Sequence, residues 1–257
     1  MRTDVVHLRE FYRSPLGQLA KQRLREKVTA VWPNLNGLRV AGVGYPAPVL
    51  RPMLDEAASV LALMPAGQGV HRWPADQANH AVQVEEVDWP VGDAMVDRLI
   101  LIHALETTEE IRPFLRECWR ILAPGGRMLV IVPNRRGMWA LRDHIPFGHG
   151  RPYTARQLRR AMQDNLFETL SADHALHLPP VIGSPLLRLL APVEPVAGRW
   201  FARFGGAVVL EAEKRVGGMV PVAARVRRYL PETAVRPVAN MSESRRPSCS
   251  RSPATRS

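Results

Sequence analysis

The sequence predicts an α/β protein built on a doubly wound, mainly parallel seven-stranded sheet, with a helical insertion before the last strand. Short apolar runs alternate with amphipathic helical stretches, which is the order that produces parallel sheets. The run at residues 96–105 is almost entirely apolar in its middle, as expected when helices cover both faces of a sheet. The length of 257 residues suits one large core.

Seven segments have the character of strands, and each is bounded by glycine, proline or polar residues. They lie at residues 38–44, 59–64, 81–87, 96–105, 127–133, 168–178 and 205–216. The helical insertion, interrupted by prolines, falls between the last two.

Helices are expected between these strands and before them. The first two occupy residues 4–12 and 16–32, the second after a Ser14 cap and a first-turn Pro15. A short helix is expected at residues 50–56. The helix at residues 107–122 has one apolar face, and Thr107 and Glu110 have capping-box spacing, although Pro113 favours a start nearer residue 112. A last helix follows the capping box of Thr154 and Gln157.

Three regions follow from this pattern. Residues 1–34 form N-terminal helices packed on the core, residues 35–234 form the main domain, and residues 235–257 form a disordered basic tail rich in Ser, Pro and Arg.

The composition favours a cytoplasmic protein. The N-terminus is charged throughout, unlike a secretory signal, and the chain contains no uncharged apolar run long enough to span a membrane. Two cysteines do not make a disulfide framework. The net charge of +11 would suit nucleic acid, but no basic patch is interleaved with aromatic residues, so a nucleic-acid partner is disfavoured.

The exit of the first strand, Gly42-Val43-Gly44, is the natural place for a nucleotide-type ligand. Glycines there let backbone approach the ligand, and the next helix is expected to offer free N–H groups to an anionic end. A tight turn without a ligand would need the same residues.

The wider pattern resembles the class I S-adenosylmethionine-dependent methyltransferases, over roughly residues 35–216. The pattern consists of GVG after a strand, acids at Glu85, Glu86 and Asp88, Asp97 opening an apolar strand, and RILAPGGR at residues 120–127. The chain looks like a methyltransferase type 11-like subgroup of bacteria, familiar from alphaproteobacteria.

The resemblance implies S-adenosyl-L-methionine as cofactor and a set of positions around it. The glycine turn would lie against its methionine part, the end of the second strand against its ribose, the segment after the third strand against its adenine, and the exit of the fourth strand beside its sulfonium. The implied residues are Gly42, Gly44, Tyr45, Met64, Glu86, Val87, Asp88, Ile102 and His103.

Three positions depart from the family pattern. Val40 stands where the family has an acid before the first glycine, Pro46 stands at its third glycine, and Met64 stands at its ribose-binding acid. These departures leave a catalytically inactive binding or regulatory subunit as the alternative to an enzyme. A nicotinamide-dependent dehydrogenase is disfavoured, because it also needs the acid that Met64 replaces.

The resemblance implies methyl transfer to a small-molecule or protein acceptor. A general base is needed only if the accepting atom carries a tightly held proton. His103 and Tyr153 are the candidates, with His144 and His149 as weaker ones, and each also suits a structural role. Residues 145–153 form a candidate substrate lid. The histidines show no metal-ligand spacing, so no metal is expected.

Overall fold

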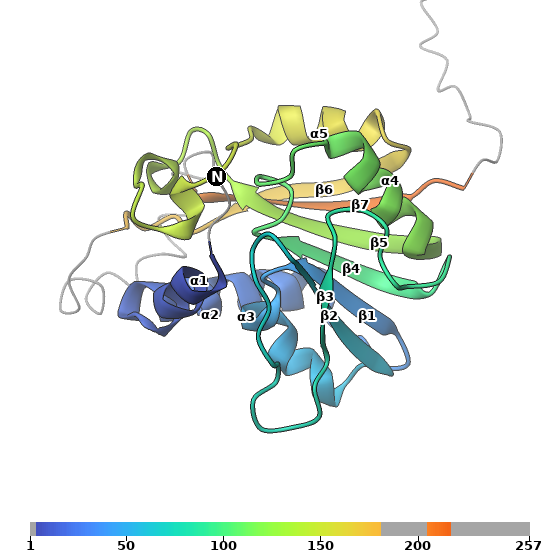
Figure 1. Ribbon diagram of the computed structural model, residues 1–257. Helices are drawn as coiled ribbons and strands as arrows, with labels where there is room; N and C mark the ends of the chain where they lie inside the picture. Colours follow the sequence, from blue (N-terminus) through green and yellow to red (C-terminus); the bar gives the residue numbers. More distant parts are fainter. Residues whose placement is uncertain (1–3, 181–204, 217–257) are drawn as a thin grey trace, which may run out of the picture. The chain divides into compact units, whose positions relative to one another are not determined.

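A computed structural model describes residues 4–180 and 205–216 and shows a seven-stranded sheet with helices on both faces (Figure 1). The strand order is β3-β2-β1-β4-β5-β7-β6. The five strands from β3 to β5 are parallel, and β7 runs antiparallel to both of its neighbours. The predicted fold class is confirmed.

The strands have the following bounds: β1 Arg39–Gly44, β2 Ser59–Pro65, β3 Ala81–Val84, β4 Val96–Ile102, β5 Leu122–Pro133, β6 Phe167–Ala175 and β7 Ala207–Lys214.

Helices lie close to their predicted positions. They are α1 Val5–Arg13, α2 Pro15–Val31, α3 Ala47–Leu50, α4 Ile111–Ile121 and α5 Ala155–Gln163. Three short 3₁₀ helices add η1 Arg51–Asp55, η2 Met138–Leu141 and η3 Pro146–Gly148. The helix expected at residues 50–56 is therefore divided between α3 and η1.

The sheet separates two apolar cores. On one face, α1, α2 and α3 pack against alternate residues of the central strands, such as Ile100 and Leu129. On the other face, α4 and α5 pack against the intervening residues, such as Leu99 and Val130. This alternation follows from the two-residue period of a strand, and it explains why β4 and β5 are apolar along most of their length.

Local signals set most helix ends. The Ser14 side chain accepts a hydrogen bond from the Gly17 N–H at the start of α2, and Thr154 and Gln157 form the predicted capping box of α5. The capping box at Thr107 and Glu110 is wrong. The Thr107 hydroxyl instead donates to the Ala104 carbonyl, and α4 begins at Ile111, which places Pro113 in its first turn.

The Ala123–Gly126 turn differs from the prediction. Strand β5 begins at Leu122, directly after α4, rather than at Arg127. Leu122 pairs with Val96 and Arg127 pairs with Arg98, so the residues between form an irregularity in which Gly125 has a φ of 70°. A glycine suits this left-handed conformation.

The helical insertion expected between β6 and β7 and the basic tail fall outside the described residues. The N-terminal helices belong to the same compact unit as the sheet, Met1–Gly218. Within the described residues, none of the helices combines the length and apolar character required to cross a bilayer.

Candidate functional site

The carboxyl ends of β1 to β5 meet at one edge of the sheet, and the strand order reverses there between β1 and β4. Gly44, the last residue of β1, lies beside Ile102, the last residue of β4. In doubly wound sheets, ligands bind outside the strand ends at such a reversal. The predicted site residues Gly44, Met64, Ile102 and His103 fall at or directly after strand ends at this edge, and Gly42 lies two residues before the end of β1.

The two glycines of the first turn face protein atoms at close range. A Cβ on Gly44 would lie 2.3 Å from the Ile102 carbonyl oxygen, and Gly44 has a φ of 92°. A Cβ on Gly42 would lie 2.4 Å from the Pro46 Cβ. Both glycines are therefore required by the packing of the turn itself.

The expected row of free N–H groups after this turn is wrong. The helix that follows has four residues, and Pro46 and Pro48 lack an N–H. The Tyr45 N–H donates to the Ile102 carbonyl, and the N–H groups of Val49 and Leu50 donate to the Pro46 carbonyl. A short helix with two prolines has few donors left to offer an anion.

Aromatic side chains cover the β1 and β4 exits. The ring of Tyr12, from α1, stacks on that of Tyr45 with centroids 5.7 Å apart. Tyr45 also contacts the ring of His71, at 5.5 Å. Tyr12, Tyr45, Met64 and His103 are all buried. Helix α1 therefore lies over the reversal point as a cover.

His103 is held in an unusual backbone conformation at the end of β4. Its φ is 52°, a region that non-glycine residues adopt sparingly and that is frequent at functional sites. The buried Gln68 side chain donates to the His103 carbonyl at 3.1 Å. The His103 Nε2 atom shares a 2.8 Å hydrogen bond with the Tyr12 hydroxyl.

Glu106 lies beside His103 and is buried. Its Oε1 atom is 3.4 Å from His103 Nδ1, and within the described residues neither of its carboxylate oxygens accepts a hydrogen bond. The buried Tyr153 hydroxyl likewise has no hydrogen-bond partner among the described residues. These three side chains and Tyr12 are called the Glu106 cluster below.

The Glu106 cluster keeps its phenols protonated. Burial, the charge of Tyr45 and the charge of Glu106 raise the pKa of Tyr12 well above its usual value. Burial and the charge of Glu106 likewise raise the pKa of Tyr153, against the smaller opposing effect of Arg151. Both phenols therefore act as hydrogen-bond donors or acceptors at neutral pH, rather than as phenolates.

The segment after β3 is tied to the segment after β4. The Glu86 carboxylate accepts hydrogen bonds from the Thr108 hydroxyl and from the Glu109 N–H, the latter at 2.7 Å. Val87 is 38% exposed, and Asp88 has a φ of 70°. Of these three predicted residues, Val87 and Asp88 face solvent and Glu86 contacts protein groups.

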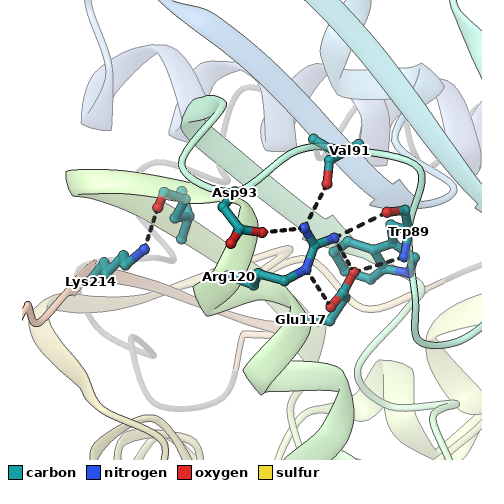
Figure 2. Close-up of polar contacts among 7 residues, drawn as sticks. Trp89, Val91, Asp93, Glu117, Arg120 and Lys214 are labelled. Carbon is teal, nitrogen blue, oxygen red and sulfur yellow. Dashed lines mark hydrogen bonds and ion pairs between the residues drawn. The ribbon is translucent and has the colours of Figure 1, made fainter.

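Arg120 fixes the loop that carries this segment into β4 (Figure 2). Its guanidinium donates to the carbonyls of Trp89 and Val91 at 3.1 and 2.7 Å and to the Asp93 carboxylate at 2.7 Å. Glu117, one turn earlier on α4, accepts from Arg120 and from the Trp89 N–H. These two carboxylates raise the pKa of Arg120 above its usual range.

The loop at residues 145–153, predicted as a candidate substrate lid, is held against the domain by a buried ring and by backbone hydrogen bonds. The Phe147 ring is buried and lies 4.8 Å from the His103 ring. The Arg151 N–H donates to the Glu106 carbonyl, and Tyr153 bridges to Asn134 after β5. His144 is exposed and His149 half-buried, and neither has a hydrogen bond to the Glu106 cluster within the described residues.

Sequence reasoning found His103 and Tyr153 but did not assign Tyr12, Gln68 or Glu106 to the site. An acid four residues after an apolar strand is a weak signal for Glu106, whereas Tyr12 comes from a helix far away in the chain. No group of three or more potential metal ligands occurs in residues 4–180 or 205–216.

Comparisons with known proteins agree with this architecture. Residues 40–130 match the family model described as a methyltransferase domain. A curated Mycolicibacterium smegmatis protein, which is named "Probable S-adenosylmethionine-dependent methyltransferase", is 33% identical over 103 residues. That match spans 38% of this chain and 35% of the relative, about a third of its length.

Solved structures show the same fold at low identity. An S-adenosylmethionine-dependent methyltransferase from Thermotoga maritima superposes with a TM-score of 0.59 at 14% identity, covering 82% of this chain and 96% of that one. One from Archaeoglobus fulgidus has a TM-score of 0.56 at 16% identity, covering 82% and 100%. The [4+2]-cyclase SpnF has a TM-score of 0.53 at 19% identity, covering 80% and 85%. The chain therefore has the fold of class I S-adenosylmethionine-dependent methyltransferases, and residues 40–130 carry the sequence pattern of the methyltransferase domain.

Proposed function

We propose that this protein binds S-adenosyl-L-methionine at the β1/β4 reversal and transfers its methyl group to a small-molecule or protein acceptor. The observation that carries the proposal is that the methyltransferase domain match and the predicted cofactor residues fall on the same strand ends. The methyltransferase domain match at residues 40–130 contains the ends of β1, β2, β3 and β4, where the predicted cofactor residues lie.

The residues at this edge fit S-adenosylmethionine better than a dinucleotide. The cofactor carries a sulfonium and an ammonium, and Glu106 supplies a buried carboxylate whose oxygens accept no hydrogen bond from the described residues. A pyrophosphate needs several free N–H groups, and the Pro46–Leu50 turn does not supply them. The same buried carboxylate would repel a phosphate.

Helix α1 supplies the cations for the cofactor's own carboxylate. Arg9 and Arg13 lie close enough to Tyr45 to lower its pKa, against the larger effect of burial. Both arginines are exposed and stand beside the exit of β1. Together with Gly42, Gly44 and Tyr45, they are the residues that we expect to hold the methionine part.

We assign the remaining cofactor contacts by place. Met64 lies at the end of β2 with its side chain fully buried, so we expect it to border the ribose through its backbone. Glu86, Val87 and Asp88 follow β3 and border the adenine, and Ile102 and His103 border the reacting end. With no carboxylate at position 64, cofactor affinity is expected to be lower by about tenfold to a hundredfold than with a charge-assisted ribose contact.

The cofactor supplies a methyl group on a positively charged sulfur, which is already a reactive electrophile. The chain's own residues align the acceptor and exclude water. The aromatic rings of Tyr12, Tyr45 and Phe147 keep the edge dry. His103 can accept a proton from the methyl acceptor at Nε2 once the Tyr12 hydroxyl no longer hydrogen-bonds to that atom. The Tyr153 hydroxyl can hold the acceptor by a hydrogen bond.

Ligand entry at this edge requires that α1 move. Tyr12 is buried over the β4 exit, and its hydroxyl occupies the Nε2 atom of His103. We therefore expect the cofactor to displace the α1 cover before the site is complete.

Calorimetry with S-adenosylmethionine and with S-adenosylhomocysteine tests the proposal. Binding of either, followed by transfer of an isotopically labelled methyl group to a fractionated cell extract, would support it. The absence of binding of both at millimolar concentration would rule it out. Binding without transfer to any fraction would indicate the non-catalytic alternative, and the SpnF neighbour shows that this fold also serves other chemistry.

A further inference from the structure

The two buried carboxylates in the described part of the chain have opposite surroundings. Glu211 accepts a 2.9 Å hydrogen bond from the Trp32 indole and pairs with Arg127. Glu106 is 2% exposed, and its two oxygens accept no hydrogen bond from the described residues. A carboxylate removed from water without donors costs several kcal/mol, so such groups normally have a cation or a donor bound to them.

The place of Glu106 indicates what would offset this cost. It lies four residues after β4, beside His103 and at the reversal point where the ligand is expected. The Glu106 Oε1 atom lies 3.4 Å from His103 Nδ1, and the other nitrogen of that ring shares a hydrogen bond with Tyr12. The surrounding phenols of Tyr12 and Tyr153 are neutral. The cluster is therefore complementary to a compact positive charge.

We propose that Glu106 recognises the positive charge on the sulfur of S-adenosylmethionine and makes the protein favour this cofactor over S-adenosylhomocysteine. The inference rests on the proposed function. The two ligands share adenine, ribose, ammonium and carboxylate, and they differ only in the methyl group and the charge on sulfur. A buried carboxylate near that sulfur stabilises the charged form and not the neutral one. Release of the demethylated product would be assisted by the same difference.

The test is isothermal titration of the full chain with three probes: S-adenosylmethionine, S-adenosylhomocysteine, and sinefungin, which carries an amine in place of the methylated sulfur. Wild-type protein should bind the two charged ligands at least about tenfold more tightly than S-adenosylhomocysteine. Glu106→Gln should remove this difference by weakening the charged ligands selectively. Gln keeps the size of the side chain and removes only its charge.

Glu110→Gln is the matched control, because it removes the same charge from an exposed residue four positions later, at the start of α4. It should leave all three affinities unchanged. Circular dichroism confirms that each variant is folded. If Glu106→Gln does not fold, wild-type affinities for the charged ligands that only equal the affinity for S-adenosylhomocysteine would still overturn the inference.

Three outcomes would contradict the inference. Equal weakening of charged and neutral ligands by Glu106→Gln would overturn the inference, because Glu106 would then act on the shared ammonium or on the fold. Unchanged affinities would also overturn it and would leave an ammonium of the acceptor as the partner of Glu106. A wild-type protein that binds none of the three probes would instead refute the proposed function, and the inference with it.

Discussion

The Tyr12 hydroxyl lies 2.8 Å from Nε2 of His103, so one buried hydrogen bond ties the first helix to the end of the central strand β4. The rings themselves meet edge to face, with centroids 5.8 Å apart. Tyr12→Phe removes the bond and keeps most of the ring contact. We expect the free energy of unfolding to fall by about 1–3 kcal/mol in urea titrations, since the partner nitrogen stays buried.

The same variant tests whether α1 covers the ligand site. A loosened cover should speed the association of S-adenosylmethionine in stopped-flow measurements. Val6→Ala, at an exposed position of α1, is the control and should change neither quantity. Slower association in Tyr12→Phe would show that the hydroxyl helps to form the site instead of closing it.

The raised pKa of Tyr45 should make the folded protein less stable at alkaline pH. Burial raises its pKa to about 12, and Arg9 and Arg13 oppose this increase only in part. A tyrosine in the unfolded chain titrates near 10, so the unfolded state loses its proton first. The contribution of Tyr45, about 2–3 kcal/mol, is therefore present below pH 10 and is lost as pH rises from 10 to 12. Urea titrations between pH 9 and 11.5 should show a shallower decline for Tyr45→Phe, and an unchanged slope would contradict the assignment.

Gly37 and Gly44 both have positive φ, but only Gly44 is closely packed, so alanine variants at the two positions distinguish the cost of backbone strain from the cost of steric overlap. Gly37 has a φ of 74° and a Cβ added there would meet no atom within 4 Å, whereas a Cβ on Gly44 would lie 2.3 Å from the Ile102 carbonyl oxygen. Gly37→Ala should cost about 1–2 kcal/mol, the usual penalty of the left-handed region. Gly44→Ala should cost more, about 3 kcal/mol or above, because β1 and β4 must also move apart. Similar melting temperatures for the two variants would mean that the turn relaxes freely.

The alternation of apolar runs correctly predicted seven strands, because the central strands are buried between the helices of the two faces. The sequence correctly predicts the two glycines at a strand exit, but it does not show why glycine is needed there. Gly42 makes room for Pro46, and Gly44 makes room for the Ile102 carbonyl. The Gly44 contact joins two strands that are far apart in sequence, so it cannot be inferred from the local sequence pattern.

The Glu106 cluster shows the same limit. His103 and Tyr153 are candidates by their place after strands, but Tyr12 enters from residues that precede the sheet altogether. Glu106 is inconspicuous in the sequence, because acids are ordinary after a strand. Its importance comes from burial without donors, which is a property of the packed structure. The Thr107 cap failed for a related reason, since that hydroxyl bonds to the preceding turn.

Arg120 should govern the order of the loop between β3 and β4. Its planar guanidinium reaches two carbonyls and two carboxylates at once, which a lysine ammonium does not. In Arg120→Lys, amide hydrogen exchange should therefore accelerate across residues 85–95, with little change in β5. Arg116→Lys, an exposed position on α4, serves as control and should leave exchange as in the wild type. Equal protection in both variants would show that the buried Trp89 anchors the loop alone.

Tyr153 and Arg151 are expected to act on the methyl acceptor and not on the cofactor. The Tyr153 hydroxyl is buried, has no hydrogen-bond partner among the described residues and lies near Glu106, so an acceptor at this edge can bond to it. The exposed Arg151 side chain stands at the rim, while its N–H is fixed to the Glu106 carbonyl. Tyr153→Phe and Arg151→Ala should therefore lower transfer of labelled methyl groups to a cell extract, and should change S-adenosylmethionine affinity less than about twofold.

Tyr153→Phe should also keep or raise the melting temperature, since it removes a buried hydroxyl that lacks a hydrogen-bond partner among the described residues. Arg156→Ala, an exposed arginine of α5, controls for loss of surface charge. Full transfer activity in both variants would reduce the loop at residues 145–153 to a structural connection that supports His103 through Phe147.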